Sequence, residues 1–257
     1  MPACPALLVS APASGQGKTS VTAAIARSAR RRGLRVRVFK TGPDYLDPMV
    51  LERASGHTVY QLDLFMGGLD HCRRLLTEAS READLILVEG VMGLFDGSPS
   101  SADLAVAFGL PVLAVLDASG MGQTFAALAT GLARFRPEVR IAGVVANRVG
   151  SDYHASMVGE GLPDDLPLVA ALRREPELSL PERHLGLVQA LELAGLDDQL
   201  DAWADAWDAG AARGRGLDGA LQPIDFDAPD EAPAGFPLDG LRIAIARDAC
   251  FSFLYPA

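Results

Sequence analysis

The chain has 257 residues and a formal net charge of −10, and 49% of its residues are hydrophobic. This length and apolar content exclude a disordered chain and a small disulfide-held protein, and the negative charge excludes general electrostatic attraction to nucleic acid or to an anionic membrane. No apolar run approaches the roughly 18 residues of a membrane span, and no secretory or transit signal precedes the first apolar stretch, so we expect a cytoplasmic protein.

Short apolar runs alternate along the chain with stretches of helical periodicity. The runs are apolar throughout, which is typical of strands buried on both faces, and the helical stretches supply crossovers between parallel strands. We therefore expect an α/β fold with a parallel sheet covered by helices. The expected strands are 6–10, 36–39, 85–88, 112–116, 141–146 and 168–170, and the expected helices are 19–32, 69–81, 101–109, 122–135 and 152–160.

The sequence pattern changes twice in the last part of the chain, from residue 191 on. A helical pattern over 191–212 carries Trp203 and Trp207 on one face, which indicates that they dock this helix on the domain rather than bind a ligand. Prolines among acidic residues and glycines then suggest a semi-rigid linker, followed by an apolar run at 241–246. We therefore expect three parts: a domain at 1–212, a linker at 213–240, and the first strand of an incomplete second domain at 241–257.

A glycine-rich segment at 11–19, called the phosphate loop below, directly follows the first expected strand and opens the first expected helix. Gly15 and Gly17 let the backbone curl so that its amides face phosphate oxygens, Lys18 can reach the outer phosphates, and Thr19 offers a hydroxyl to Mg²⁺. Position 12 is proline where such loops usually begin with glycine, so the loop is a variant. A phosphate site is the interpretation we favour over a simple glycine-rich turn.

Charged groups follow the next two expected strands. Lys40 ends one strand and precedes Asp44 and Asp47, which we expect on a loop fixed by two prolines, while Glu89 ends the following strand. Lys18 and Lys40 are the only lysines among 23 basic residues. Because ligands of open parallel sheets gather at the carboxyl ends of strands, we expect these groups to meet the phosphate loop and to hold a metal or substrate. Taken singly, each carboxylate has the alternative role of a helix cap or turn residue.

Further polar residues at strand ends have two alternative interpretations. Asn147 ends a strand, where its amide could contact a nucleobase or simply form a turn, and Asp117 could join the site or cap a helix. No nucleophile with a neighbouring base stands out. Phosphoryl transfer to a carboxylate needs none, because that acceptor is already ionised at neutral pH.

Six motifs together carry a family resemblance: SGQGKTSVT at 14–22, KTGPDYLDP at 40–48, EGVMGLFDG at 89–97, DASGMGQT at 117–124, NRVGSDYH at 147–154 and PERHLGLVQALE at 181–192. Along essentially its whole length the chain resembles the cobyrinic acid a,c-diamide synthases, which belong with the dethiobiotin synthetase-like P-loop NTPase proteins. The resemblance implies ATP- and Mg²⁺-dependent activation of the a and c carboxylates of a corrin ring as acyl phosphates, followed by amidation with ammonia from glutamine in cobalamin biosynthesis.

The resemblance also implies roles for individual residues. ATP would be bound by Ser14, Gly15, Gln16, Gly17, Lys18, Thr19 and Ser20 at its phosphates and by Asn147 at its adenine. Mg²⁺ or the transferring group would be held by Thr19, Asp44 and Glu89. The corrin carboxylate and the acyl phosphate would be surrounded by Lys40, Tyr45, Leu46, Asp47 and Asp96, with Arg183 and His184 holding the polycarboxylate substrate or, alternatively, capping a helix.

The resemblance stops short of the ammonia-generating part. Members continue into a glutaminase-like domain, of which 241–257 resembles only the beginning, so ammonia would come from that domain, from another chain or from solution. Two alternatives stay open: another tetrapyrrole substrate such as nickel-sirohydrochlorin, or a nucleotide-switched ATPase of the partition type. The second is disfavoured because Ala13 occupies the position where partition ATPases carry an extra lysine. A homodimer is expected by analogy.

Overall fold

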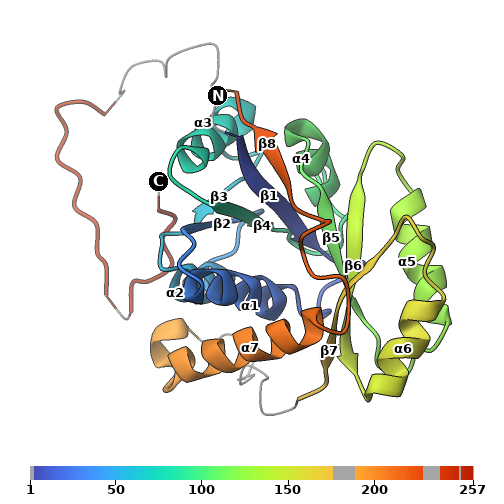
Figure 1. Cartoon of the computed structure of the whole chain (residues 1–257). Coiled ribbons are helices and arrows are strands. Elements are labelled where there is room, and N and C mark those ends of the chain that lie inside the picture. Colours follow the sequence, from blue (N-terminus) through green and yellow to red (C-terminus); the bar gives the residue numbers. More distant parts are fainter. Residues whose placement is uncertain (1–2, 176–188, 228–237, 249, 257) are drawn as a thin grey trace.

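The computed structural model describes residues 3–175, 189–227, 238–248 and 250–256 of the chain (Figure 1). The strands are β1 Ala3–Ser10, β2 Val36–Lys40, β3 Tyr60–Gln61, β4 Leu85–Glu89, β5 Val112–Asp117, β6 Ile141–Val149, β7 Leu168–Arg173 and β8 Gln222–Asp225. The helices are α1 Lys18–Arg31, α2 Leu46–Ser55, α3 Gly68–Ser80, α4 Ser101–Phe108, α5 Thr124–Arg134, α6 Asp152–Glu160, the short 3₁₀ turn η3 Ala190–Glu192 and α7 Leu196–Ala211.

All six expected strands are confirmed and form one parallel sheet. Its order is β3-β2-β4-β1-β5-β6-β7, with β8 added antiparallel to β1. β1 therefore lies between β4 and β5, at the point where the strand order reverses, and the loop that follows β1 opens at the carboxyl edge of the sheet. In folds of this class that edge is where ligands bind.

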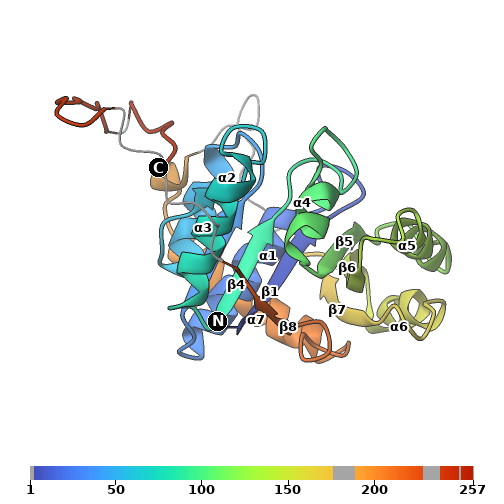
Figure 2. The same cartoon turned by 90° about the horizontal axis from the view of Figure 1, so that it is seen from above.

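The alternation of side chains along each strand fills two layers of core. Leu7 and Val9 of β1 face α1, α2 and α7, whereas Ala6 and Leu8 face α3 and α4, and all four are fully buried. α5 and α6 cover β5, β6 and β7 on the latter face, as the view from above shows (Figure 2). Because both faces are covered, the strands read as continuous apolar runs. Within the described ranges, no helix combines the length and the apolar character needed to cross a membrane.

α2 was not predicted, because two prolines in the segment 40–48 suggested a loop. The helix begins at Leu46, so Pro48 occupies its first turn, where the missing amide proton of proline costs no intrahelical hydrogen bond. Asp47, expected on the loop, therefore lies in the first turn of α2. Asp44 remains before the helix and accepts the amide protons of Leu46 and Asp47 through Oδ1.

α7 docks along α1 through two tryptophans and a set of ion pairs. Trp203 and Trp207 are 4% and 2% exposed and belong to the same core cluster as α1, which confirms their predicted docking role. Arg27 of α1 forms a two-pronged contact with Asp201 of α7, with both N–O distances at 2.8 Å. The helix is thus an integral part of the domain.

Truncating Trp207 to alanine is expected to lower the free energy of unfolding by about 3–5 kcal/mol, the usual cost of removing a large buried aromatic side chain. Asp198→Ala, at an exposed position of the same helix, is the control and should cost under about 1 kcal/mol. Urea denaturation followed by circular dichroism measures both. A Trp207→Ala chain as stable as the control would mean that α7 does not depend on this contact.

The segment predicted as a linker, 213–240, is only partly separate from the domain. β8 lies within it and pairs with β1, and Ala220 and Phe226 on either side of β8 are buried in the core. Proline at 223 is accommodated because β8 pairs on one side only, with β1. The prediction of a linker is therefore wrong for residues 213–227, whereas 228–237 lie outside the described residues.

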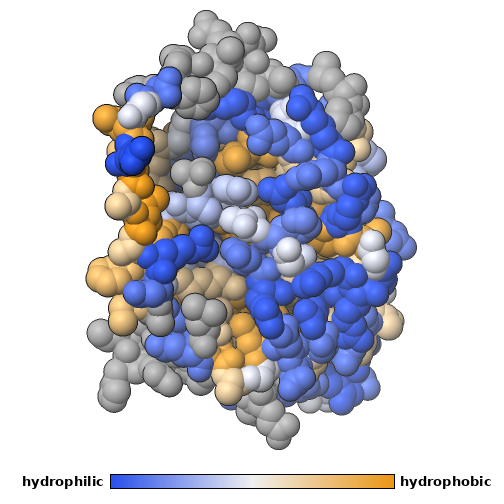
Figure 3. Space-filling model, turned by 90° about the vertical axis from the view of Figure 1, so that its left-hand side faces the viewer, coloured by the Kyte–Doolittle hydropathy of each residue, from blue (hydrophilic) through white to orange (hydrophobic). Residues whose placement is uncertain are grey.

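The strand expected at 241–246 is not formed. Residues 241–248 have no regular secondary structure, and Leu241, Ile243 and Ile245 are 63–68% exposed. This part of the chain runs along the side of the molecule seen in Figure 3, where apolar side chains lie open to solvent. An isolated strand without neighbours cannot satisfy its backbone or bury its side chains, which explains the difference from the sequence pattern.

Candidate active site

The loop between β1 and α1 turns tightly at two glycines. Gly15 and Gly17 have φ angles of 78° and 94°, in the left-handed region that glycine adopts without steric cost. Gly17 is also the N-cap of α1 and has no side chain to cap the first amides of the helix. A helix terminus of this kind attracts anions through its amides and its dipole.

The carboxyl ends of β5 and β6 brace this loop. Asn147 at the end of β6 donates from Nδ2 to the carbonyl oxygen of Gln16 at 2.8 Å, and the amide of Asp117 at the end of β5 donates to Oε1 of Gln16 at 2.7 Å. The carboxylate of Asp117 accepts two hydrogen bonds from Ser119 and pairs with Arg148, so it does not cap α5. Asn147 thus holds the phosphate loop, and its contact with adenine stays a prediction.

Replacing Gly17 with alanine is expected to weaken ATP binding about tenfold while the fold is retained. The added Cβ would crowd Asn147, and the resulting strain in the loop costs on the order of 1–3 kcal/mol. A Cβ at Gly17 would lie 2.3 Å from Nδ2 of Asn147. Gly15→Ala is the matched control, since its φ is also positive but its Cβ would meet no atom within 4 Å. Titration calorimetry with ATP compares the two. Equal affinities would show that the approach of Asn147 does not shape the loop.

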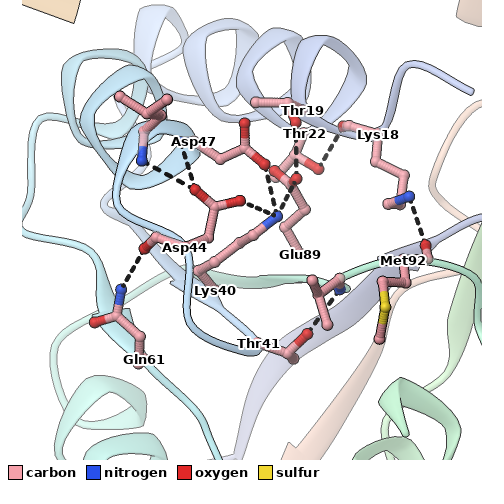
Figure 4. Close-up of polar contacts among 12 residues, drawn as sticks. Lys18, Thr19, Thr22, Lys40, Thr41, Asp44, Asp47, Gln61, Glu89 and Met92 are labelled. Carbon is pink, nitrogen blue, oxygen red and sulfur yellow. Dashed lines mark hydrogen bonds and ion pairs between the residues drawn. The ribbon is translucent and has the colours of Figure 1, made fainter. Parts of the chain in front are cut away.

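Lys18 folds back over the loop. Its Nζ donates to the carbonyl oxygens of Met92 at 2.7 Å and Ala13 at 3.1 Å (Figure 4). Burial lowers the pKa of Lys18, against the opposing attraction of Glu89. Charged phosphate oxygens are stronger partners for an ammonium than carbonyl oxygens are, so the side chain is placed to transfer to a bound triphosphate.

A second lysine lies at the centre of a cluster of acidic side chains. The strand register places Lys40 of β2 directly beside Glu89 of β4, and Lys40 Nζ contacts Glu89 Oε1 at 2.7 Å and Asp47 Oδ2 at 2.8 Å. Asp44 Oδ2 lies 3.6 Å from the same ammonium. Thr19, from the phosphate loop, donates to Glu89 Oε1 at 2.8 Å. The structure therefore brings together the loop residue and the three carboxylates predicted from the strand ends (Figure 4).

Burial and mutual charge set the protonation of this cluster. Complete burial raises the pKa of Glu89 to about 7, although Lys40 pulls it down. Burial alone would lower the pKa of Lys40, but Glu89, Asp47 and Asp44 outweigh it and the net shift is upward. Burial, together with the charge of Asp47, raises the pKa of Asp44, whereas attraction to Lys40 overcomes burial at Asp47 and lowers its pKa. Lys40 is therefore a permanent cation among carboxylates.

The donor set of the cluster fits a divalent cation such as Mg²⁺. Glu89 Oε2 is buried and has no hydrogen-bond partner among the described residues, so one carboxylate oxygen beside Thr19 is unsatisfied there. Oxygen ligands of this kind suit Mg²⁺, which is usually held by one or two carboxylates and completed by phosphate oxygens and water. Over the described parts of the chain, no cluster of three or more His, Cys, Asp or Glu could hold a metal on its own.

The loop after β4 lies against the phosphate loop. The amide of Leu94 donates to the carbonyl oxygen of Ala11 at 2.7 Å, and a Cβ at Gly93 would lie 2.6 Å from the carbonyl oxygen of Pro12. Asp96 is exposed and accepts the amide proton of Gly93 at 3.0 Å. Asp96 therefore lies beside the phosphate loop at the rim of the site and does not contact the acidic cluster around Lys40.

The other residues predicted for the site lie at its edges or outside the described residues. Tyr45 and Leu46 lie at the start of α2, next to the acidic cluster, and are half-buried. Ser14 and Ser20 flank the glycine turn, Ser20 within the first turn of α1. Arg183 and His184 lie outside the described residues.

Sequence reasoning missed several supporting contacts. Gln61 Nε2 donates to the carbonyl oxygen of Asp44 at 3.1 Å, and Thr41 Oγ1 accepts the amide proton of Val91 at 2.8 Å. Gln61 belongs to β3, whose two residues are too few for a strand pattern. The carbonyl group of Met92, which holds Lys18, has no side-chain signature at all. Thr41 directly follows Lys40 in the motif and was the one detectable signal.

Comparison with known proteins places this site in a family. Residues 7–188 match the family described as CbiA, the CobQ/CobB/MinD/ParA nucleotide binding domain. In overall fold the chain is similar to chloroplast FtsY from Physcomitrella patens, with a TM-score of 0.50 and 15% identity over 79% of this chain and 65% of that chain.

Curated relatives are considerably more similar in sequence. The chain is 59% identical over 255 residues to hydrogenobyrinate a,c-diamide synthase of Stutzerimonas stutzeri and 58% identical over 254 residues to the protein of the same name in Pseudomonas aeruginosa; these alignments cover 99% of this chain and 58% and 57% of the relatives. It is 56% identical over 259 residues to cobyrinate a,c-diamide synthase of Herminiimonas arsenicoxydans, covering 98% of this chain and 56% of that relative. The chain thus spans less than three fifths of the length of these proteins. Since the family match covers more than half of the chain and includes the phosphate loop and the acidic cluster, the chain belongs to the CobQ/CobB/MinD/ParA nucleotide binding domain family.

Proposed function

We propose that this chain is the ATP-using part of a hydrogenobyrinate or cobyrinate a,c-diamide synthase. The contact that joins the phosphate loop, through Thr19, to the buried pair of Glu89 and Lys40 supports the proposal most strongly. This contact brings the phosphate loop, a cation and a buried carboxylate to one point. The arrangement supplies the positioning and charge stabilisation that phosphoryl transfer to a substrate carboxylate requires. The names of the relatives supply the substrate class.

The proposed reaction has two steps. An ionised carboxylate of the corrin side chain attacks the γ-phosphorus of ATP, and the bond to the β-phosphate oxygen breaks to release ADP and leave an acyl phosphate. Ammonia then attacks the acyl carbon, phosphate leaves, and the ammonia nitrogen loses a proton to give the amide. Lys18 and Lys40 stabilise the charge on the transferring group, and no general base is needed for the first step.

The proposed roles of the other site residues follow their positions. The amides and side chains of 14–20 would hold the phosphates and Asn147 the adenine, while Thr19, Glu89 and Asp44 would hold Mg²⁺, which supplies charge neutralisation when bound. Around the macrocycle we place Tyr45, Leu46, Asp47, Asp96, Arg183 and His184. A glutaminase domain or free ammonia as nitrogen source, and a homodimer, belong to the same proposal.

The test is amidation by this chain in the presence of ATP, Mg²⁺ and an ammonium salt. Incubation with hydrogenobyrinic acid and, separately, with cobyrinic acid should add two amides, detected as a mass shift of the macrocycle, and ATP hydrolysis should depend on the macrocycle. Glutamine in place of ammonium should give little product from this chain alone. Turnover of nickel-sirohydrochlorin alone would redirect the substrate, whereas ATP-dependent dimerisation on DNA or lipid without macrocycle turnover would contradict the proposal.

A further inference from the structure

A stack of three aromatic rings joins the end of the described chain to the site. The ring of Tyr45 stacks on Tyr255 with centroids 4.4 Å apart and planes 19° apart, and on Phe253 at 5.3 Å and 5°. Ser252 in the same segment donates to Oε1 of Gln189 at 2.7 Å. The segment 250–256 therefore lies against the start of α2, where Figures 1 and 2 both place the end of the chain.

Tyr45, the residue that this segment contacts, lies between two carboxylates of the site. Tyr45 lies between Asp44, whose Oδ1 accepts the amide protons of Leu46 and Asp47, and the first turn of α2, which carries Asp47. Asp47 in turn contacts Lys40 at 2.8 Å. A ring stacked on Tyr45 therefore restrains the turn that presents both carboxylates to the buried lysine.

The stack also provides a surface of suitable chemistry for the proposed substrate. Phe253 is 47% exposed, and Tyr45 and Tyr255 are half-buried, so part of the aromatic surface faces solvent beside the acidic cluster. Burial and then a side-chain hydrogen bond with Tyr45 raise the pKa of Tyr255 to about 12. A conjugated macrocycle has a flat face that packs on such rings, while carboxylates at its rim extend toward cations.

We propose that Phe253 and Tyr255 are positioning residues that hold Tyr45 at the place where the macrocyclic substrate binds, so that a rim carboxylate points toward the phosphate loop. The inference rests on the proposed function and adds two residues that no site prediction included. Losing both stacked pairs frees the Tyr45 ring and should weaken macrocycle binding roughly tenfold.

The experiment uses the 257-residue chain with Phe253→Ala, Tyr255→Ala and the double variant. Visible absorption of hydrogenobyrinic acid measures its Kd without ATP, and amidation with ammonium gives kcat and both KM values. In the double variant we expect Kd and KM for the macrocycle to rise about tenfold, with kcat and the KM for ATP changed less than about twofold. Tyr255→Phe keeps the ring and should stay close to the unchanged chain. Phe251→Ala, exposed in the same segment and without a ring contact among the described residues, is the control.

The outcomes separate the two proposals. Unchanged macrocycle affinity in the double variant, or an equal rise in the KM for ATP, would overturn the positioning role, because the second result indicates general loosening of the domain. Loss of affinity in Tyr255→Phe as large as in Tyr255→Ala would overturn the stacking argument. If the unchanged chain binds ATP but neither binds nor amidates the macrocycle, the proposed function fails and this inference fails with it.

Discussion

Replacing Lys40 with methionine is expected to abolish amide formation and to lower the free energy of unfolding by about 3–5 kcal/mol, the usual cost of removing one partner of a buried ion pair. The ammonium is 2% exposed and contacts Glu89 and Asp47, with Asp44 slightly further away. Without it these carboxylates lack their cation, and the pKa of Glu89 must rise further so that protonation limits the cost. Urea denaturation measures stability, and the mass shift of the macrocycle measures turnover.

The other lysine of the chain is the matched control. Lys18 is also buried, but within the part of the chain that the structure describes its Nζ contacts two carbonyl oxygens and no carboxylate. Lys18→Met should therefore lower kcat/KM for ATP by about 10²–10³-fold, as loss of a charge-stabilising donor does, with a much smaller loss of stability than Lys40→Met. Lys40→Arg should not rescue activity, because a planar guanidinium does not fit a compact ammonium site. A Lys40→Met chain as stable as Lys18→Met would contradict the role of Lys40 as the central cation.

The parts of the fold predicted from sequence were those with a repeated local signal. Strands buried on both faces give unbroken apolar runs, and all six were recognised. α2 and β3 were missed for different reasons: Pro48 in the first turn of a helix resembles a loop residue, and the two residues of β3 carry no periodicity. β8 was missed because its pairing with β1 depends on the tertiary structure and its own sequence contains a proline.

The site was predicted in outline because the topology of a parallel sheet limits where strand ends can meet. Glycines 15 and 17, Lys18 and Thr19 have a characteristic spacing, and Glu89 and Lys40 each end an apolar strand. The register that puts those two side by side cannot be read from either strand alone. The same holds for two contacts with backbone carbonyl oxygens, that of Lys18 with Met92 and that of Asn147 with Gln16, because a carbonyl oxygen has no sequence signature.

Glu89→Gln is expected to reduce turnover at least about 10²-fold, since a charged oxygen ligand is lost from the transfer site, yet to stabilise the metal-free chain. The folded-state pKa of Glu89 is about 7, above its ordinary value of 4.5. The attraction of Lys40 therefore does not repay the cost of burying the carboxylate, even though Lys40 and Asp47 both face it. A neutral amide of the same shape avoids that cost.

The difference in the free energy of unfolding between Glu89→Gln and the unchanged chain is expected to depend on pH. Between about 4.5 and 7 the folded chain keeps a proton on Glu89 that the unfolded chain has released, so this group lowers stability as pH rises. The advantage of Glu89→Gln over the unchanged chain should therefore grow across this range, to about 3 kcal/mol, and level off above it. Urea denaturation at several pH values, without nucleotide or Mg²⁺, measures the difference. A glutamine variant that is less stable at pH 8 than at pH 5, relative to the unchanged chain, would mean that the ion pair with Lys40 outweighs burial. Lys40→Met and Glu89→Gln then form a decisive pair, because each removes one member of the same contact and each impairs turnover. They are expected to shift stability in opposite directions, since only Glu89→Gln relieves a buried carboxylate.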